Sequence, residues 1–275
     1  MYIIMYNART MFMFMIVVNK HTSTHTPLHT TQTPQLTHYT ALSWTTIESK
    51  PRSLVHQVDK IDNFQNLGCP ILRFRASMKG PCVGTVFARF IMNIDARKKW
   101  DPSIKEVYEA YPIQDLDVAN VVMGFGKYGD CSRLGVGYCQ TKSYLAVPGR
   151  EQLTLCGIQD FEDGSCVIWG TEMEEWHNHL LPEIKEGKKR LPRSKTHLFC
   201  TTLVPTGPDT FDVEYALQID VGGLPNWLTT PILMETIKGL FKHGQQFFTQ
   251  NQVEFLAEME QIDRLMERDG ILMTP

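Results

Sequence analysis

Arg97, Asp101 and Arg150 are the side chains of this sequence best suited to orient the charged or polar group of a ligand. A guanidinium pairs bidentately with a phosphate or a carboxylate, so each arginine is a candidate for holding an anionic group. A structural pair between Arg97 and Asp101, or a solvated charged face, is the alternative interpretation. The sequence leaves these alternatives open.

A second cluster, residues 172–179, combines carboxylates with His177 and His179. A His-x-His spacing can chelate a metal, but the cluster falls where a strand ends and a proline-rich, basic loop begins. The chain contains no G-x-S-x-G elbow, P-loop or glycine-rich dinucleotide fingerprint in a fitting context. We therefore expect no catalytic residue, no metal and no cofactor.

The seven cysteines are odd in number and include no C-x-x-C pair, which favours a reducing, cytosolic setting. We interpret them as small apolar residues that fill the core. A net charge of −3 and a pI of about 6.3 provide no overall attraction to nucleic acid. A nucleic-acid partner is therefore not expected.

The first 43 residues differ in composition from the rest of the chain. No Asp or Glu occurs before residue 48, and ten threonines lie between residues 22 and 46. Such a stretch cannot bury enough apolar area to offset its ordering entropy, so we expect disorder over about residues 19–43. The apolar run at residues 11–18 is either a targeting segment or an unselected N-terminus. Residues 44–275 are predicted to form one domain.

Period-two alternation predicts strands at residues 53–61 and 71–78, and helical spacing predicts an amphipathic helix at residues 83–94 followed by a helical turn at 96–101. Six strand-like runs then follow without an intervening helix, at residues 104–111, 118–125, 152–161, 165–173, 197–204 and 211–220. Successive strands of this kind form an antiparallel meander.

A long amphipathic helix is predicted to start at Thr230 and Pro231 and to keep one apolar face over about ten turns. Gly239 and Gly244 interrupt it, and each costs roughly 1 kcal/mol relative to alanine. A helix weakened near its start could move as a lid.

Two segments resemble the START (StAR-related lipid-transfer) family. Residues 90–101 contain the R-x-x-W-D pattern as Arg97, Trp100 and Asp101. Residues 215–228 resemble the family's last strand, its D-x-G-G turn, and the proline and tryptophan that enter its terminal helix. The phosphatidylcholine-transfer-like branch looks nearest.

The resemblance implies an α+β helix-grip fold, in which a curved antiparallel sheet is closed by a long C-terminal helix around a hydrophobic cavity. It also implies binding and intermembrane transfer of a phospholipid or sterol-like lipid. An acyl chain of ~16 methylenes costs roughly 13 kcal/mol to expose to water, and an apolar tunnel removes that cost. We expect the lipid to contact Arg97, Trp100, Asp101, Arg150, Phe199, Tyr215, Trp227, Leu233, Ile237, Leu240 and Phe241.

Two segments could meet a membrane surface. Residues 126–137 are glycine-rich, match the family's mobile loop and are either a membrane-dipping loop or an ordinary solvent loop. The basic run at residues 185–195 either meets anionic lipid or is a solvated loop. The expected protein is a monomeric, cytoplasmic carrier that lies peripheral to membranes.

Fold alone does not determine function, so two alternatives stay open. One is an enzyme of cyclase or hydrolase type on the same helix-grip scaffold. The other is a regulatory interaction domain in which lipid binding moves the terminal helix and changes the affinity for a partner.

Overall fold

The computed structural model describes residues 3–7, 10–14, 43–62, 64–79, 94–113, 131–144, 147–160, 165–184 and 189–268. The chain divides into two compact units, one made of residues 1–43 and 115–129 and the other of residues 44–114 and 130–275. The two units are described separately below.

The smaller unit contains one antiparallel hairpin of strands β1 (Ile3–Asn7) and β2 (Thr10–Phe14). Strand β2 includes the start of the apolar run that the sequence offered as a targeting segment. The stretch predicted to be disordered lies, up to residue 42, outside the described residues, so that prediction stays a prediction.

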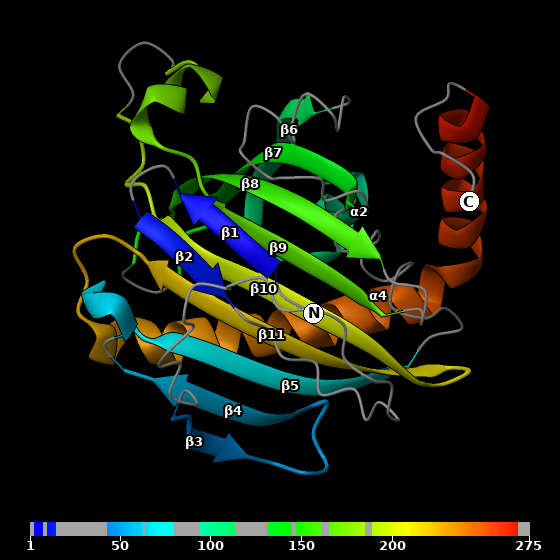
Figure 1. The fold of residues 1–275 in the computed structure, drawn as a ribbon, viewed down its shortest axis with the longest axis horizontal. Helices are drawn as coiled ribbons and strands as arrows, with labels where there is room; N and C mark the ends of the chain where they lie inside the picture. The colour runs from blue at the N-terminus through cyan, green and yellow to red at the C-terminus, as the bar shows by residue number, and fades with distance from the viewer. Residues whose placement is uncertain are drawn as a thin grey trace, which may run out of the picture. The chain divides into compact units, whose positions relative to one another are not determined.

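Within the described residues of the larger unit, nine strands form one antiparallel sheet in the order β3-β4-β5-β11-β10-β9-β8-β7-β6. Figure 1 shows that this sheet is curved. The strands are β3 (Thr45–Ser49), β4 (Val55–Ile61), β5 (Ile71–Lys79), β6 (Ile104–Ile113), β7 (Cys131–Thr141), β8 (Glu151–Asp160), β9 (Cys166–Glu172), β10 (Lys195–Gly207) and β11 (Thr210–Asp220).

Helix α4 (Asn226–Arg268) follows β11 and runs across the sheet (Figure 1). The short helix α2 (Ile94–Trp100) leads into β6, and two 3-10 helices, η1 (Phe64–Asn66) and η2 (Glu175–Leu180), lie between strands. The predicted α+β helix-grip fold, a curved antiparallel sheet closed by a long C-terminal helix, is confirmed.

Two predicted elements differ in the structure. Residues 131–137, predicted as part of a glycine-rich loop, belong to β7, because extended backbone accommodates Gly135 and Gly137 when both neighbouring strands supply hydrogen bonds. Helix α4 begins at Asn226 rather than at Thr230, so Pro231 lies inside it. The predicted strand at 118–125 and most of the predicted helix at 83–94 lie outside the described residues.

The core lies between the sheet and α4. Strand β5 shows why: its residues alternate between buried and partly exposed, so one face of the strand is apolar. Phe74 of β5, Tyr215 of β11 and Phe241 of α4 form successive edge-to-face ring contacts, with centroids 6.1 and 6.0 Å apart. Helix α4 passes close to Trp100 at Gly244, where a Cβ would lie 3.5 Å from the indole ring, an ordinary van der Waals distance.

The outer face of β4 and β5 carries a buried carboxylate. Asp59 is 0% exposed and accepts hydrogen bonds from Thr46 Oγ1 (2.8 Å), Gln57 Nε2 (2.7 Å) and Arg73 Nη2 (2.7 Å). Arg73 also lies 3.9 Å from the Trp44 ring centroid. This network joins the edge strand β3 to the sheet, because Thr46 belongs to β3.

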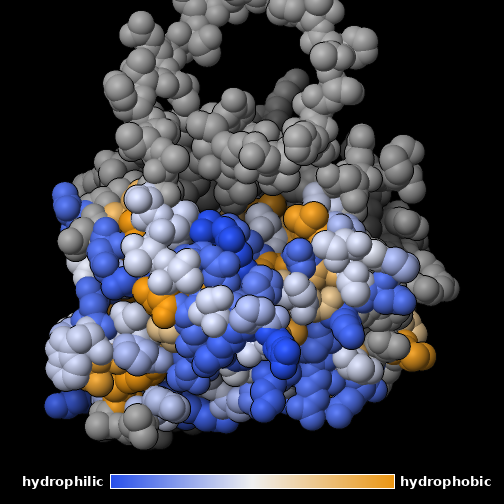
Figure 2. All heavy atoms as spheres, turned by 90° about the horizontal axis from the view of Figure 1, so that it is seen from below, coloured by the Kyte–Doolittle hydropathy of each residue, from blue (hydrophilic) through white to orange (hydrophobic). Residues whose placement is uncertain are grey.

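Among the described strands β3 pairs only with β4, so it is an edge strand, and its sequence TTIES is mostly polar. Seen from below the view of Figure 1, the molecule is mostly hydrophilic with small, separate hydrophobic patches (Figure 2). Polar and charged residues at a sheet edge discourage pairing with another chain.

His197 of β10 provides a test of the packing at one end of the sheet. Its contacts with Cys69 and Glu172, whose Oε1 lies 3.3 Å from Nδ1, raise the pKa of His197 to about 9. Since the folded pKa exceeds the unfolded value of about 6.5, the stabilisation is complete below pH ~6.5 and is lost as the pH rises through ~9.

We expect the free energy of unfolding to fall by roughly 1–3 kcal/mol between pH 6.5 and 9.5 through this group. Urea unfolding of the wild-type chain and of His197→Gln across this range measures the effect. A variant whose stability falls as steeply as that of the wild type would contradict the assignment to His197.

Candidate functional site

A cavity of about 230 Å³ lies between the sheet and α4. Its lining comes from β6, β7, β8, β10 and β11, from Arg97 of α2 and the turn after α2, and from the α4 residues Leu233, Thr236, Ile237 and Leu240. Strands of the second half of the sheet and the C-terminal helix therefore enclose it together.

Small residues create this space. On the face of β7 and β8 that lines the cavity, cross-strand pairs bring together Gly137 with Thr154, and Gly135 with Cys156. A Cβ built on Gly137 would meet nothing within 4 Å. By contrast, the neighbouring part of the sheet carries aromatic residues that reach α4 and fill the interior. The cavity lies where side chains are too short to fill the space between sheet and helix.

Gly170 of β9 positions one wall. A Cβ at this glycine would lie 2.9 Å from the Phe199 ring, so only glycine lets that ring lie against the β9 backbone. Phe199 then contacts Tyr215, with ring centroids 5.5 Å apart. The two rings form an apolar boundary of the cavity.

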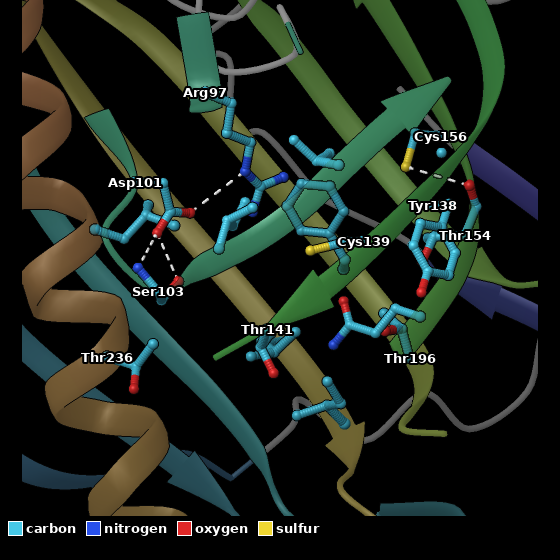
Figure 3. A pocket seen from close by; sticks show the side chains of 18 of the residues that line it. Arg97, Asp101, Ser103, Tyr138, Cys139, Thr141, Thr154, Cys156, Thr196 and Thr236 are labelled. Atoms are coloured by element: carbon cyan, nitrogen blue, oxygen red, sulfur yellow. Dashed lines mark hydrogen bonds and ion pairs between the residues drawn. The ribbon is translucent and has the colours of Figure 1, made fainter. Parts of the chain in front are cut away.

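Arg97, Asp101 and Ser103 form the charged end of the cavity (Figure 3). Arg97 Nε lies 3.4 Å from Asp101 Oδ2. Asp101 Oδ1 accepts two further hydrogen bonds, from Ser103 N at 3.0 Å and Ser103 Oγ at 2.5 Å. Asp101 is 4% exposed, whereas the Arg97 side chain is 32% accessible because it faces the cavity.

Two titratable side chains beside Arg97, Cys139 and Tyr215, stay neutral at physiological pH. Burial raises the pKa of the Cys139 thiol, and the positive charge of Arg97 opposes this rise only in part. Burial likewise raises the pKa of Tyr215 to about 12. For Arg97, burial alone would lower the pKa, but Cys139 and Asp101 raise it above its usual value. The cavity wall thus holds one permanent cation, Arg97, and the carboxylate side chains of Asp101 and Glu109, while Cys139 and Tyr215 are neutral.

The structure brings seven of the residues that the sequence proposed into the cavity wall. They are Arg97, Asp101, Phe199, Tyr215, Leu233, Ile237 and Leu240. Two others, Trp100 and Phe241, are 5% and 3% exposed and belong to the core cluster beside the cavity. Their rings face other core side chains, because α2 and α4 pack together at that point.

Arg150 and Trp227 lie elsewhere. Arg150 is buried, and its guanidinium donates to the carbonyl oxygens of Val221 (2.6 Å) and Pro148 (2.8 Å), which ties the turn before β8 to the turn after β11. Trp227 is 77% exposed in the first turn of α4. Neither residue lines the cavity, because one is used by backbone carbonyls and the other points to solvent.

Sequence reasoning missed the polar and small residues of the wall. These are Ser103, Glu109, Gly135, Gly137, Cys139, Thr141, Gln152, Thr154, Cys156, Thr196 and Thr236. A usable signal exists in the alternation of β7, where the residues of the cavity face are Gly135, Gly137, Cys139 and Thr141. Small residues at every second position of a strand indicate a face that leaves space above it.

The basic run at residues 185–195 is partly attached to the protein. Arg190 Nη1 lies 3.1 Å from Glu151 Oε1, and Arg193 donates to the Asn178 side chain and to the carbonyl of Met173.

Among the described residues no group of three or more His, Cys, Asp or Glu side chains could hold a metal ion. Nor does any described helix combine the length and apolar character that crossing a membrane requires.

No protein-family model and no curated protein sequence matches this chain. Solved structures match it in fold. Human StAR-related lipid transfer protein 5 superposes with a TM-score of 0.57 at 17% identity, over 78% of this chain and 89% of that chain. The human STARD10 structure gives 0.56 at 17% identity, over 76% of each chain. The human StarD13 (DLC2) lipid transfer and protein localization domain gives 0.55 at 12% identity, over 75% and 89%.

Proposed function

We propose that this chain, which has the fold of the START domains, binds a lipid in the cavity beneath α4 and carries it between membranes. The observation that supports this most directly is an internal cavity with an apolar wall of Phe199, Tyr215, Leu233, Ile237 and Leu240 and one charged end. Such a cavity removes an acyl chain or ring system from water while a few polar groups orient its head.

A carrier, rather than an enzyme, fits the chemistry of the wall. No histidine is among the described residues that line the cavity. The thiol nearest the charged end, Cys139, has a raised pKa and is therefore a poor nucleophile. The described cysteines Cys69, Cys139, Cys156, Cys166 and Cys200 form no disulfide with one another, which fits the cytoplasmic carrier that we propose.

Native mass spectrometry of the chain purified from cells tests the proposal. We expect a co-purifying lipid in the mass of the intact protein, and we expect its loss on denaturation. The same measurement on Gly137→Leu, whose new side chain fills the cavity, is the matched control. A chain that carries no lipid after expression in several hosts would overturn the proposed function.

Transfer requires contact with a membrane, and one end of the sheet offers a surface for it. Trp227 and Tyr144 are 77% and 50% exposed. Arg150 links the segment of Tyr144 to the segment of Trp227. It follows Tyr144 by six residues, and its guanidinium donates a hydrogen bond to the carbonyl oxygen of Val221, which lies shortly before Trp227. The cavity residues Thr141, Gln152 and Thr196 lie at the same end of the strands. Exposed tryptophan and tyrosine rings favour the membrane interface.

We expect Trp227→Ser to slow lipid transfer between vesicles by about five- to tenfold, because it removes an interfacial anchor of roughly 1–2 kcal/mol. Since the ring is outside the cavity, lipid bound per protein should stay unchanged. Stopped-flow transfer between donor and acceptor vesicles provides the rate. Equal transfer rates for the variant and the wild type would remove Trp227 from the docking surface.

We propose that helix α4 moves when a lipid enters, and two polar contacts join it to the sheet in this structure. Lys238 Nζ lies 2.7 Å from Glu48 Oε2 of the edge strand, and Gln245 bonds both the N–H and the carbonyl of Lys79. Gly239 lies next to the first contact and meets no atom within 4 Å of its Cβ position. We propose that α4 bends near Gly239 when it opens.

Gly239→Ala should therefore stabilise the fold by about 0.5–1 kcal/mol, since alanine suits a helix better and has room here. If bending at this glycine accompanies opening, transfer slows by about two- to fivefold. Thermal unfolding and vesicle transfer measure the two effects. A stabilised variant that transfers at the wild-type rate would show that α4 opens without bending at Gly239.

A further inference from the structure

Arg97 has hydrogen-bond donors that no described residue of the protein uses. Among the described residues its guanidinium pairs only with Asp101, through Nε at 3.4 Å. The guanidinium carries five N–H donors, so the terminal Nη groups stay available to a ligand. The side chain is one of those that line the cavity (Figure 3).

Asp101 does not compete for these donors. Ser103 donates two hydrogen bonds to its Oδ1, and Arg97 Nε lies beside its Oδ2. The carboxylate is thereby held in place, with only 2% of its side chain accessible. A guanidinium can bind a carboxylate bidentately through its outer edge. No described residue occupies this edge of Arg97, which lines the cavity.

Gln152 adds a second polar group. It lines the cavity on β8 and is the cross-strand partner of Cys139, another residue of the cavity wall. No hydrogen bond joins its carboxamide to another of the described residues. The Nε2 group can therefore donate to a ligand oxygen inside the cavity.

The volume of the cavity limits which lipid can carry the oxygen that Arg97 and Gln152 would bind. Its volume of about 230 Å³ lies below the ~300–1,000 Å³ of typical small-molecule sites. A glycerophospholipid with two acyl chains and a phosphate ester requires far more space than one chain does. The strip formed by Gly135 and Gly137 suits one narrow apolar chain lying along β7.

We infer that the lipid of this cavity is a single-chain amphiphile that ends in a carboxylate, of the long-chain fatty acid class, with its head between Arg97 and Gln152. This inference rests on the proposed function and specifies its ligand. The carboxylate carries one negative charge, which one free guanidinium edge can neutralise, whereas a phosphate ester brings a glycerol or a further head group into the same small space.

Competition among defined lipids tests the ligand class. The delipidated full chain is incubated with equimolar palmitic acid, methyl palmitate, dipalmitoylphosphatidylcholine and cholesterol, and the bound mass is read by native mass spectrometry. Palmitic acid should dominate, at least tenfold over its methyl ester, which has the same chain and no charge. Arg97→Met should reduce this ratio to about one, and Gln152→Leu should reduce it severalfold.

The outcomes separate this inference from the proposed function. Retention of phosphatidylcholine or cholesterol in preference to palmitic acid would overturn the ligand class and leave lipid carriage standing. Equal binding of the acid and its ester would overturn the role of the carboxylate. Binding of none of the four lipids would count against both. Circular dichroism confirms that each variant is folded, and Gln152→Leu keeps the test valid should Arg97→Met fail to fold.

Discussion

Replacing Gly137 by leucine is expected to reduce lipid binding more than tenfold while the fold is retained. The Cβ position of Gly137 meets no atom within 4 Å, so the new side chain enters the cavity of about 230 Å³ without displacing protein atoms. Glycine is also unfavourable inside a strand, and thermal stability should stay equal or rise. Lipid bound per protein, read by native mass spectrometry, measures the effect.

Gln140→Leu is the matched control for this substitution. Gln140 lies three residues further along β7, on the opposite face of the strand, and is not part of the cavity wall. It adds the same apolar side chain to the same strand, so lipid binding should stay at the wild-type level. If Gly137→Leu binds lipid as well as Gln140→Leu does, the ligand lies somewhere other than this cavity.

Asp59→Ala is expected to lower the free energy of unfolding by about 3 kcal/mol or more. The substitution removes a fully buried carboxylate and leaves Arg73, only 12% accessible, without its partner at 2.7 Å. Breaking one side of a buried ion pair typically costs ~3–5 kcal/mol. Thr46 and Gln57 lose their acceptor as well. Urea unfolding provides the measurement.

The pH dependence of stability identifies the charge of Asp59 as the cause. Burial raises the pKa of this carboxyl, but the hydrogen bonds from Gln57, Thr46 and Arg73 outweigh burial and lower it. Its stabilisation is therefore present above the unfolded pKa of about 3.9 and is lost as the pH falls through the folded pKa. The free energy of unfolding of Asp59→Ala should therefore lack the part that the wild type loses as the pH falls.

Asp212→Ala is the control for Asp59→Ala. Asp212 is an exposed aspartate of β11 that accepts one hydrogen bond, from Ser77 Oγ at 2.7 Å. Because water replaces that bond readily, we expect a loss below about 1 kcal/mol. Comparable losses for Asp59→Ala and Asp212→Ala would refute the role of burial at Asp59.

Local patterns were sufficient for most of the architecture. The alternation in β5 and the apolar stripe of α4 are each repeated within a single segment, so their periods can be read directly from neighbouring residues. The pair of Arg97 and Asp101 was also recognisable, since both residues occur in one short motif. Residues 131–137 were misread, because glycine is common in loops and nothing local reveals the strands on either side of β7.

The direction in which a side chain points was less predictable. Trp227 and Leu233 occur in the same helix, yet one is exposed and the other lines the cavity. Arg150 was proposed for a ligand, and its guanidinium is instead bonded to the carbonyl oxygen of Val221, 71 positions later in the chain, as well as to that of nearby Pro148. A partner such as Val221 lies too far away in the sequence for any local pattern to contain it.

The sequence by itself thus indicated the helix-grip fold, the arginine at the charged end of the site, and the order of the larger unit's strands apart from β3 and β7, which it did not predict. Only the tertiary structure decided where the cavity lies and which residues form its wall. The physical reason is that a cavity is a shortage of side-chain volume between packed elements. Cross-strand register places Gly137 beside Thr154, and α4 lies above them, so that shortage exists only once the sheet and the helix have come together.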